Sequence, residues 1–285
     1  MKIDLHIHST ASDGTCTPAE ILRLAGEMGI GIFSITDHDT VAGSKEILGM
    51  EIPPPIRFIP GLEISAQSPD SFPCAGSFHI LGYNMDVDDS VLNQTLEVLR
   101  EARRNRNPRI IENLTRMGFD LSMEELIRHA GDSQIGRPHI AGLMLKKGFV
   151  QSIDEAFDKY IGTGKPAYVD KYRISSTEAI TMIRNAGGTA VLAHPGLLKP
   201  LIPFSFEEMI LHLRKIGLCG IEVWYPEHSA EQTACYAQVA DRCGLIKTGG
   251  TDFHGAVKPG LQMGIGRGDF RVPYSAGGQL ILCSA

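Results

Sequence analysis

The chain has 285 residues, of which 43% are hydrophobic and 21% are charged, a balance typical of a globular enzyme with one large domain. Its 27 basic and 33 acidic residues give a formal net charge of −6, which excludes a global basic field for duplex DNA, so an anionic substrate needs a local source of positive charge. The sequence has no run of 18 apolar residues, no apolar leader core and no C-x-x-C pair among its six cysteines, so we expect a cytoplasmic protein with reduced thiols and no membrane contact.

Short apolar runs alternate with amphipathic stretches over most of the chain. Four strands are predicted in the first third, at residues 3–7, 31–36, 56–64 and 78–83. Thr17 before Pro18 predicts the start of a helix after the first strand, because a hydroxyl caps free N–H groups and proline suits the first helical position. Three later strands are predicted at 188–193, 220–224 and 245–249, with helices near 41–48, 205–216 and 230–243.

Seven strands, most of them separated by helices, favour a parallel α/β barrel over an open sheet. Between the fourth and fifth strands, residues 90–185 have helical periodicity and almost no strand character. We therefore expect one domain over 1–285, in which residues 98–165 form an inserted helical subdomain that serves as a lid or substrate-binding part.

The first chemical signal is the pair His6 and His8 in the strand at 3–7. Residues two apart on a strand point to the same face, so both imidazoles face one way while Leu5 and Ile7 face the other. The pair lies at the carboxyl end of the strand, where barrel enzymes place their active sites. Two ordinary buried histidines would give the same local pattern, so the other strand ends decide the interpretation.

Histidines and carboxylates recur at those other strand ends. His38 follows the second strand, Glu63 ends the third, and His79 lies at the start of the fourth. The first, fifth and seventh strands are followed by Asp13, His194, Asp252 and His254. With His6 and His8 these residues make nine candidate metal ligands at one end of the predicted barrel.

Nine ligands exceed what one metal ion accepts, so two or three ions are predicted. Imidazole suits zinc, iron and manganese, whereas carboxylates suit harder divalent ions. Glu63 could bridge two ions through its separate oxygens. Without a metal, the same residues would be costly buried polar groups gathered in one place.

The motifs, taken in order, resemble those of the polymerase and histidinol phosphatase (PHP) superfamily. They are H-x-H at 6–8, S-x-x-S-D-G at 9–14, T-D-H at 36–38, G-L-E at 61–63, the lone His79, H-P at 194–195 and T-D-F-H-G at 251–255. Asp13-Gly14 and the segments 136–139 (G-R-P-H) and 164–169 (G-K-P-A-Y-V) are most similar to one subfamily. Its members hydrolyse 3′,5′-nucleoside bisphosphates and 5′ ends of short RNA, the RNase AM type.

The resemblance implies a distorted (β/α)7 barrel, a relative of the TIM barrel, that holds three divalent metals, commonly manganese. By position, one ion would be held by His6, His8, Glu63 and Asp252. A second would be held by Asp13, His38 and His254, and a third by Glu63, His79 and His194. The ligand types also accept Fe2+ and Zn2+.

Such a centre suits a phosphate dianion. Three divalent ions carry six positive charges, and the carboxylates Asp13, Glu63 and Asp252 offset three of them. A hydroxide that bridges two ions is available near neutral pH, because metal binding lowers the pKa of water, and it would attack phosphorus in line. We expect four of the ligands to act in this catalytic step: Asp13, His38, His194 and His254.

The predicted insertion offers cations for a second phosphate. Arg103 and Arg106 share one helix face, and Arg137 and His139 open another helix, whose N-terminus favours anions. Guanidinium groups bind phosphate through two parallel hydrogen bonds. We expect these four residues and Lys165 to bind the phosphate that is not cleaved, although a solvated helix face would show the same charges.

Weaker candidates lie beside these motifs. Asp4 and Glu222 are placed to orient a metal ligand through a hydrogen bond. Trp224, Tyr225 and His228 follow the sixth strand and could line a pocket for the base.

The leading hypothesis is a nucleotide phosphatase that removes one phosphate from a 3′,5′-nucleoside bisphosphate, with 5′-to-3′ exonuclease action on short RNA as an extension. Another phosphomonoesterase of the superfamily, such as a histidinol-phosphate phosphatase, is the first alternative, but its small substrate needs no second phosphate site. A C–N hydrolase of a related barrel family fits the T-D-H and T-D-F-H-G motifs poorly. A non-catalytic metal-binding regulatory domain is also disfavoured, because such domains usually lose ligands and here every position is filled.

Overall fold

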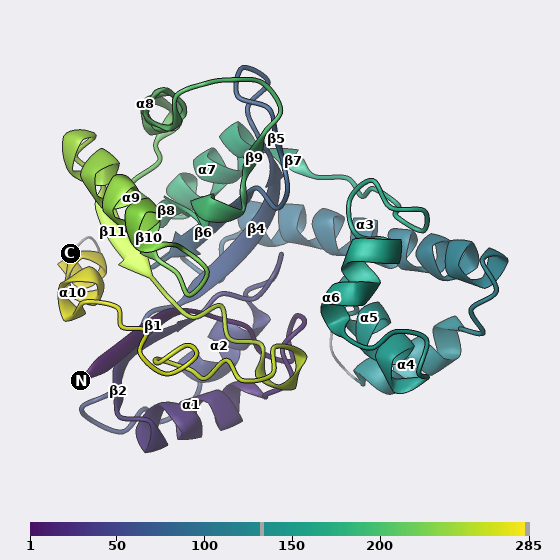
Figure 1. Ribbon diagram of the computed structural model, residues 1–285. Helices are drawn as coiled ribbons and strands as arrows, with labels where there is room; N and C mark the ends of the chain where they lie inside the picture. The colour runs from purple at the N-terminus through teal and green to yellow at the C-terminus, as the bar shows by residue number, and fades with distance from the viewer. Residues whose placement is uncertain (132–133, 283–285) are drawn as a thin grey trace.

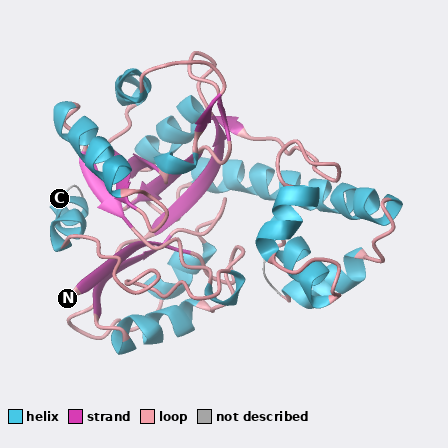
Figure 2. Ribbon diagram, in the orientation of Figure 1, coloured by secondary structure: helices cyan, strands magenta, loops and turns pink. Residues whose placement is uncertain are grey.

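The computed structural model describes residues 1–131 and 134–282, and it divides into a strand-rich body and a helical projection (Figure 1). The strands of the body are β1 (Lys2–Ile7), β2 (Ile30–Ile35), β3 (Arg57–Phe58), β4 (Gly61–Gln67), β5 (Cys74–Ala75), β6 (His79–Tyr83), β7 (Ile174–Ser175), β8 (Thr189–Leu192), β9 (Lys199–Pro200), β10 (Gly220–Trp224) and β11 (Ile246–Gly249). The helices that accompany them are α1 (Pro18–Glu27), α2 (Ala42–Leu48), α7 (Ser176–Asn185), α8 (Phe206–Ile216), α9 (Ala230–Arg242) and α10 (Tyr274–Leu282). Figure 2 shows these helices around the strands.

The body is an α/β fold built on two main sheets. One sheet has the order β1-β2-β3, and the other has the order β11-β10-β8-β6-β4-β7. Isolated bridges connect the sheets at both seams, one between Ile7 and Phe253 and one between His38 and Glu63. Tyr83 also donates a hydrogen bond to the carbonyl of Leu5 (2.9 Å) across the interior. The strands thus follow each other in the circular order of a barrel, but over residues 1–131 and 134–282 no continuous ladder closes it.

The all-parallel arrangement that we predicted is wrong for one strand. β6 pairs antiparallel with both β4 and β8, whereas the other long strands pair in parallel. A parallel pair needs a long crossover, usually a helix, but residues 68–78 between β4 and β6 carry only turns and the two-residue β5. The short connection therefore reverses the chain. The strand predicted at 56–64 is also split, because Pro60 cannot donate to a ladder.

Local signals placed the first helix correctly. Thr17 caps α1 by accepting from the N–H of Glu20 (3.2 Å), while the Glu20 carboxylate accepts from the N–H of Thr17 (2.8 Å). Pro18 occupies the first position, where a missing N–H costs nothing. α1 then buries Ile21 and Ala25 against β2.

The helical projection has its own apolar core. It consists of the second half of α3 (Ser90–Arg116), then α4 (Met123–Ala130), α5 (Arg137–Lys146), α6 (Ile153–Ala156) and a π-helical turn (Phe157–Ile161). Ile110, Leu114 and Leu126 pack there with residues up to Val169, whereas Leu92, Leu96 and Leu99 of the same long α3 pack in the strand-side core. α3 therefore joins the two cores. Residues 132 and 133 of the predicted insertion lie outside the described residues.

Two expectations from composition concern the whole chain. Over the described residues, no helix is both long enough and apolar enough to cross a membrane. The five cysteines in the described part are unpaired, and Cys283 lies outside it.

Candidate metal centre and substrate cleft

All nine predicted ligands meet at one rim of the strand-rich body. β1 supplies His6, and His8 follows it directly; Glu63 lies within β4. His79 is the first residue of β6, and because β6 runs antiparallel, its beginning lies at the rim where the parallel strands end. The loops after β1, β2, β8 and β11 supply the rest: Asp13, His38, His194, Asp252 and His254.

Glu63 lies at the centre of the group. Its Oε1 is 2.8 Å from Nδ1 of His79 and 2.9 Å from Nε2 of His194. Its Oε2 faces the other side, 2.8 Å from Nδ1 of His38 and 3.3 Å and 3.5 Å from Nε2 of His8 and His6. The two oxygens thus face two different sets of imidazoles, as a carboxylate that bridges two ions would.

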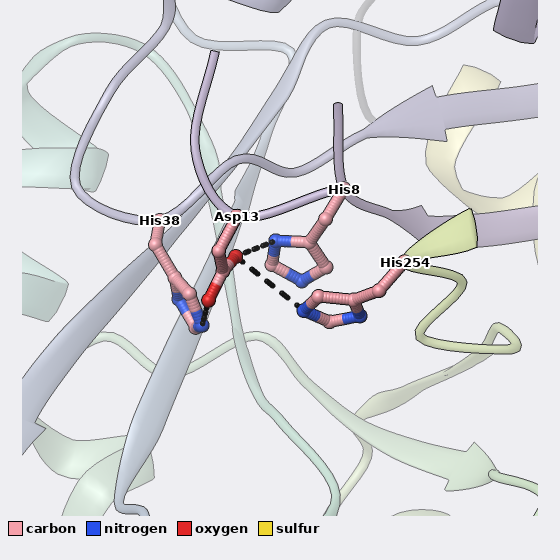
Figure 3. A group of neighbouring side chains, drawn as sticks. All are labelled: His8, Asp13, His38 and His254. Carbon is pink, nitrogen blue, oxygen red and sulfur yellow. Dashed lines mark ion pairs between the residues drawn. The ribbon is translucent and has the colours of Figure 1, made fainter. Parts of the chain in front are cut away.

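Asp13 gathers a second set, drawn in Figure 3. Its Oδ1 is 3.4 Å from Nε2 of His254 and 3.7 Å from Nδ1 of His8, and its Oδ2 is 3.9 Å from Nε2 of His38. These four residues each offer one ligand atom, and the four atoms lie within 4.8 Å of one another. The separations are longer than hydrogen bonds and close to those of ligand pairs on one ion, which are about 3 to 3.5 Å for metal–ligand bonds near 2.1 Å.

Asp252 presents its two oxygens to different partners. Oδ1 is 3.2 Å from Nε2 of His8 and 3.5 Å from Nε2 of His6. Oδ2 accepts hydrogen bonds from Nζ of Lys258 (2.5 Å) and from the hydroxyl of Tyr225 (3.0 Å). Sequence reasoning did not single out Lys258; its one signal is a lysine shortly after the T-D-F-H-G motif.

The electrostatics of the centre fit divalent cations. Burial raises the pKa of Glu63, but His79 and His38 lower it well below its usual range, so the carboxylate stays charged. Burial lowers the pKa of His8, and the carboxylates of Asp252 and Glu63 then raise it to about 9. A metal ion binds the neutral imidazole, so a cation bound here would compete with this proton.

Several buried ligand atoms also lack a hydrogen-bond partner among the described residues. They are Nε2 of His6 and His8, Oδ1 of Asp13, Nδ1 of His38 and Nδ1 of His194. Buried polar atoms normally make hydrogen bonds, so several buried atoms without one at the same place indicate a bound group. The imidazole and carboxylate donors suit manganese, iron or zinc, and we conclude that this is a metal site.

Buried carboxylates orient the ligands. Glu222 contacts Nδ1 of His6 (2.9 Å) and accepts from the N–H of His194 (2.7 Å), as expected for an orienting residue. Asp4 accepts from the N–H and hydroxyl of Thr251 (2.9 and 2.6 Å), next to Asp252. Asp252 itself has a φ of 52°, an uncommon backbone region for a residue other than glycine.

Asp37 of the T-D-H motif has a structural part. It accepts hydrogen bonds from the N–H and hydroxyl of Ser9 and from the hydroxyl of Ser12, at 2.6 to 2.7 Å. These bonds fix the loop that carries Asp13. The serines of the S-x-x-S-D-G motif therefore position the loop, while its aspartate faces the histidines.

A cleft of about 680 Å³ opens above the metal centre. Its base is lined by seven of the predicted ligands: Asp13, His38, Glu63, His79, His194, Asp252 and His254. The wall toward α3 and α5 carries five cations: Arg103, Arg106, Arg137, Lys171 and Arg173. Sequence reasoning missed Lys171 and Arg173, whose signal was only the basic run K-Y-R before the strand β7.

The cations of this wall differ in how they are paired. Arg103 and Lys171 contact Oδ2 of Asp39 at 2.7 Å and 3.0 Å. Arg106 is only 5% exposed, and its guanidinium donates to the amide oxygen of Asn107 (2.7 Å). Arg137 lies between the rings of Phe157 and Tyr168, 5.5 Å and 5.4 Å from their centroids. No carboxylate in the described residues pairs with Arg106 or Arg137.

This crowding of positive charge alters the pKa values of the wall. Burial and the nearby Arg103 lower the pKa of Arg106 to about 9, and they lower that of Lys171 to about 7. Burial likewise lowers the pKa of Arg137. A bound anion would relieve the repulsion.

Other predicted residues lie away from the cleft. Lys165 is exposed, and His139 is buried, where its Nδ1 accepts from the N–H of Gly136 (3.0 Å); neither lines the cleft. Trp224 packs against the apolar cores, both ring nitrogens of His228 have backbone partners, and neither residue lines the cleft. Tyr225 does line the cleft, but its hydroxyl is bound to Asp252.

Comparisons with known proteins agree with this geometry. Residues 4–161 match the family model of the PHP domain. The chain is 33% identical to a 3′,5′-nucleoside bisphosphate phosphatase of Chromobacterium violaceum over 92% of this chain and 90% of that protein. It is 32% identical to the 5′-3′ exoribonuclease Rnm of Escherichia coli over 88% of this chain and 84% of that protein.

A solved structure from Bifidobacterium adolescentis, assigned as a metal-dependent phosphoesterase, superimposes with a TM-score of 0.87. It is 27% identical and covers 99% of this chain and 96% of its own. The match extends over the strand-rich body and the helical projection together. The chain therefore belongs to the PHP domain family, and it is a metal-dependent phosphoesterase, a hydrolase of phosphoric ester bonds.

Proposed function

We propose that this enzyme hydrolyses one phosphate monoester of a 3′,5′-nucleoside bisphosphate. The observation that carries the proposal is a pair of arginines, the buried Arg106 and the half-buried Arg137, which line the cleft without a carboxylate partner among the described residues. An unpaired buried cation is costly, and a phosphate dianion offers it charge and hydrogen-bond acceptors.

The cationic wall and the metal centre line the same cleft. Five cations on the wall stand against two carboxylates, because Asp39 pairs with Arg103 and Lys171, and Asp170 pairs with Arg173 (2.6 Å). The wall therefore keeps an excess of positive charge for a second phosphate. A substrate with two phosphates satisfies both ends of the cleft, and the Chromobacterium relative is named for such a substrate.

Three metals are part of the proposal. The first would be held by His6, His8, Glu63 and Asp252, the second by Asp13, His38 and His254, and the third by Glu63, His79 and His194. The split of the Glu63 oxygens between two sets of imidazoles supports more than one ion. We propose Mn2+, with Fe2+ and Zn2+ compatible with the same donors. When bound, such ions supply positive charge for the phosphate oxygens and lower the pKa of a water nucleophile.

The protein's own side chains do the positioning. Glu222 holds the ring of His6 and the backbone of His194, so these two ligands keep their orientation. Lys258 and Tyr225 hold Oδ2 of Asp252, which directs Oδ1 toward His6 and His8. Arg106 and Arg137 would bind the phosphate that stays on the substrate and so place the other phosphate over the metal centre. All four predicted catalytic residues line the floor of the cleft: Asp13, His38, His194 and His254.

We also propose that residues 98–165 are an inserted substrate-binding subdomain. The separate apolar core of the helical projection supports it, as do the cleft residues that α3 and α5 contribute. That core extends to Val169, beyond the predicted boundary.

Short RNA with a 5′ phosphate is the second candidate substrate. In such a chain the 5′ phosphate and the first phosphodiester have the same relation as the two phosphates of the bisphosphate. One wall and one metal centre would then serve both reactions. The Escherichia coli relative, named as a 5′-3′ exoribonuclease, supports this extension.

The test is phosphate release by manganese-loaded protein from three substrates: adenosine 3′,5′-bisphosphate, AMP and histidinol phosphate. We expect the bisphosphate to be hydrolysed at least 100-fold more efficiently than the other two, and chelation to abolish the reaction. Equal hydrolysis of histidinol phosphate or AMP would be consistent with the metal centre but would overturn the proposal that the substrate carries two phosphates.

A further inference from the structure

The cleft has a third kind of wall, besides the metal centre and the cations. Pro138 and Leu145 of α5, Ile153 of α6 and Phe157 of the π-helical turn line it with apolar surface. Leu145 is 38% exposed, so its side chain is accessible to a ligand in the cleft. Pockets for small organic ligands combine such apolar walls with a few polar groups.

This apolar wall lies beside the cationic wall on the same helix. Arg137 and Pro138 open α5, and Leu145 follows Pro138 by seven residues, two turns later on the same helix face. The rise between Pro138 and Leu145 is about 10 Å. A ligand whose phosphate meets Arg137 would extend along this face with its uncharged part against Leu145.

Polar side chains border the apolar wall. Gln151, Ser152 and Asp154 line the cleft where α6 begins, next to Ile153. Gln151 and Asp154 are exposed, so their side chains are available for hydrogen bonds at the edge of a ring. A flat apolar ring with donors and acceptors at its edge is the chemistry of a nucleobase.

We infer that the helical projection binds the nucleobase of the substrate, with the ring packed against Leu145, Ile153 and Phe157 and its polar edge toward Gln151 and Asp154. The inference rests on the proposed bisphosphate substrate and deepens it. This base site differs from the one predicted at Trp224, Tyr225 and His228. The polar atoms of Tyr225 and His228 already have partners within the protein, and Trp224 packs against the apolar core. One helix, α5, then contributes to the recognition of both the phosphate and the base.

The experiment compares substrates with and without a base in the manganese-loaded enzyme. Adenosine 3′,5′-bisphosphate is set against the base-free 1-deoxyribose 3,5-bisphosphate, and each is assayed with wild type and Leu145→Ser. Leu145 is the first choice because Phe157 also contacts the guanidinium of Arg137, so a change at Phe157 would disturb the phosphate-binding wall as well. Phe157→Ala therefore serves only as a second variant. Ile127→Ser is the matched control, since Ile127 is a 53% exposed aliphatic residue of α4 that does not line the cleft.

We expect Leu145→Ser to lower kcat/KM for the adenosine substrate about 10-fold, the scale of a lost base contact, and to leave the base-free substrate within 2-fold. Ile127→Ser should change neither. An equal loss on both substrates, or no loss on either, overturns the inference.

A binding measurement separates this inference from the proposed reaction. Equilibrium dialysis with AMP and with ribose 5-phosphate requires no turnover. Tighter binding of AMP by wild type, lost in Leu145→Ser, supports the base site even if no bisphosphate is hydrolysed. Equal binding of AMP by wild type and Leu145→Ser overturns the base site even if bisphosphate is hydrolysed rapidly.

Discussion

At the scale of single residues, Glu222 links two of the candidate metal ligands. It is fully buried, contacts the ring of His6 and accepts from the backbone of His194, whose φ of 24° is uncommon for a residue other than glycine. Hydrogen bonds of this kind fix the ring orientation and the protonated nitrogen of a histidine ligand.

Glu222→Gln should therefore weaken metal binding about 10- to 100-fold, because the amide is a poorer acceptor for His6. Titration of the metal-free protein with manganese, followed by calorimetry, measures the change. Glu46→Gln, at an exposed site on α2, should bind manganese as wild type does. Unchanged affinity in Glu222→Gln would remove the orienting role assigned to this carboxylate.

Lys171 gives the wall a pH dependence that can be measured. Its ammonium is buried beside Arg103 and Arg106, and its pKa falls to about 7. Below pH 7 the lysine is charged in both the folded and the unfolded chain, and the folded state bears the full cost of the buried charge. Above pH 7 the folded state loses the proton while the unfolded state keeps it up to about pH 10, so stability rises.

Relative to Lys171→Met, wild type should therefore gain stability as the pH rises from 7 toward 10. Urea unfolding of both proteins across this range gives the difference, which cancels the titration of other groups. A difference that does not vary with pH would mean that Lys171 keeps an ordinary pKa in the folded protein.

At the scale of elements, α3 contributes residues to both apolar cores. Leu96 is buried in the strand-side core and Leu114 in the core of the helical projection, on one continuous helix. Removal of a buried leucine side chain costs about 2 to 5 kcal/mol. The two positions therefore allow each core to be weakened separately.

Leu114→Ala should loosen the projection and raise KM for the bisphosphate, while the number of bound metals stays as in wild type. Hydrogen exchange of α4 and α5 amides should become faster in this variant. Leu96→Ala is the counterpart on the same helix and should instead speed exchange in the strand-rich body. Loss of metal from Leu114→Ala would contradict the independence of the two cores.

The existence of β6 could be predicted from the sequence, but its direction could not. The apolar run 78–83 predicted a strand correctly, and His79, predicted as a ligand from its chemistry, lies beside Glu63. Its direction depends on the connection from β4, and a loop rich in serine and proline shows no pairing pattern of its own. In a parallel strand, a histidine at the beginning would have lain at the opposite rim.

At the scale of the molecule, sequence motifs predicted the cluster of histidines and carboxylates at the rim better than they predicted the cleft above it. The nine ligands lie in compact motifs at strand ends, which the fold brings to one rim. Lys258, Lys171 and Arg173 lie on loops whose paths depend on tertiary packing, so no local pattern distinguishes them from surface charges. For the same reason Lys165, which belongs to a recognisable segment, lies on an exposed turn outside the cleft.

The net charge of −6 and the cationic wall together concern how the enzyme selects an anionic substrate. A net negative charge disfavours nonspecific binding to nucleic acid, and five buried or half-buried cations concentrate positive charge on the cleft wall that would bind a phosphate. Specificity should then depend on Arg106 and Arg137 and not on the many exposed arginines.

The most direct test of the two-phosphate account compares kcat/KM for adenosine 3′,5′-bisphosphate with that for 4-nitrophenyl phosphate, in wild type and in Arg106→Ala. Arg104→Ala is the control, because Arg104 is exposed on α3 and paired with Glu97. We predict that Arg106→Ala lowers the ratio at least 30-fold, by loss of bisphosphate hydrolysis alone, and that Arg104→Ala leaves it unchanged. If Arg106→Ala slowed both substrates equally or neither, the second phosphate would not be bound by this wall.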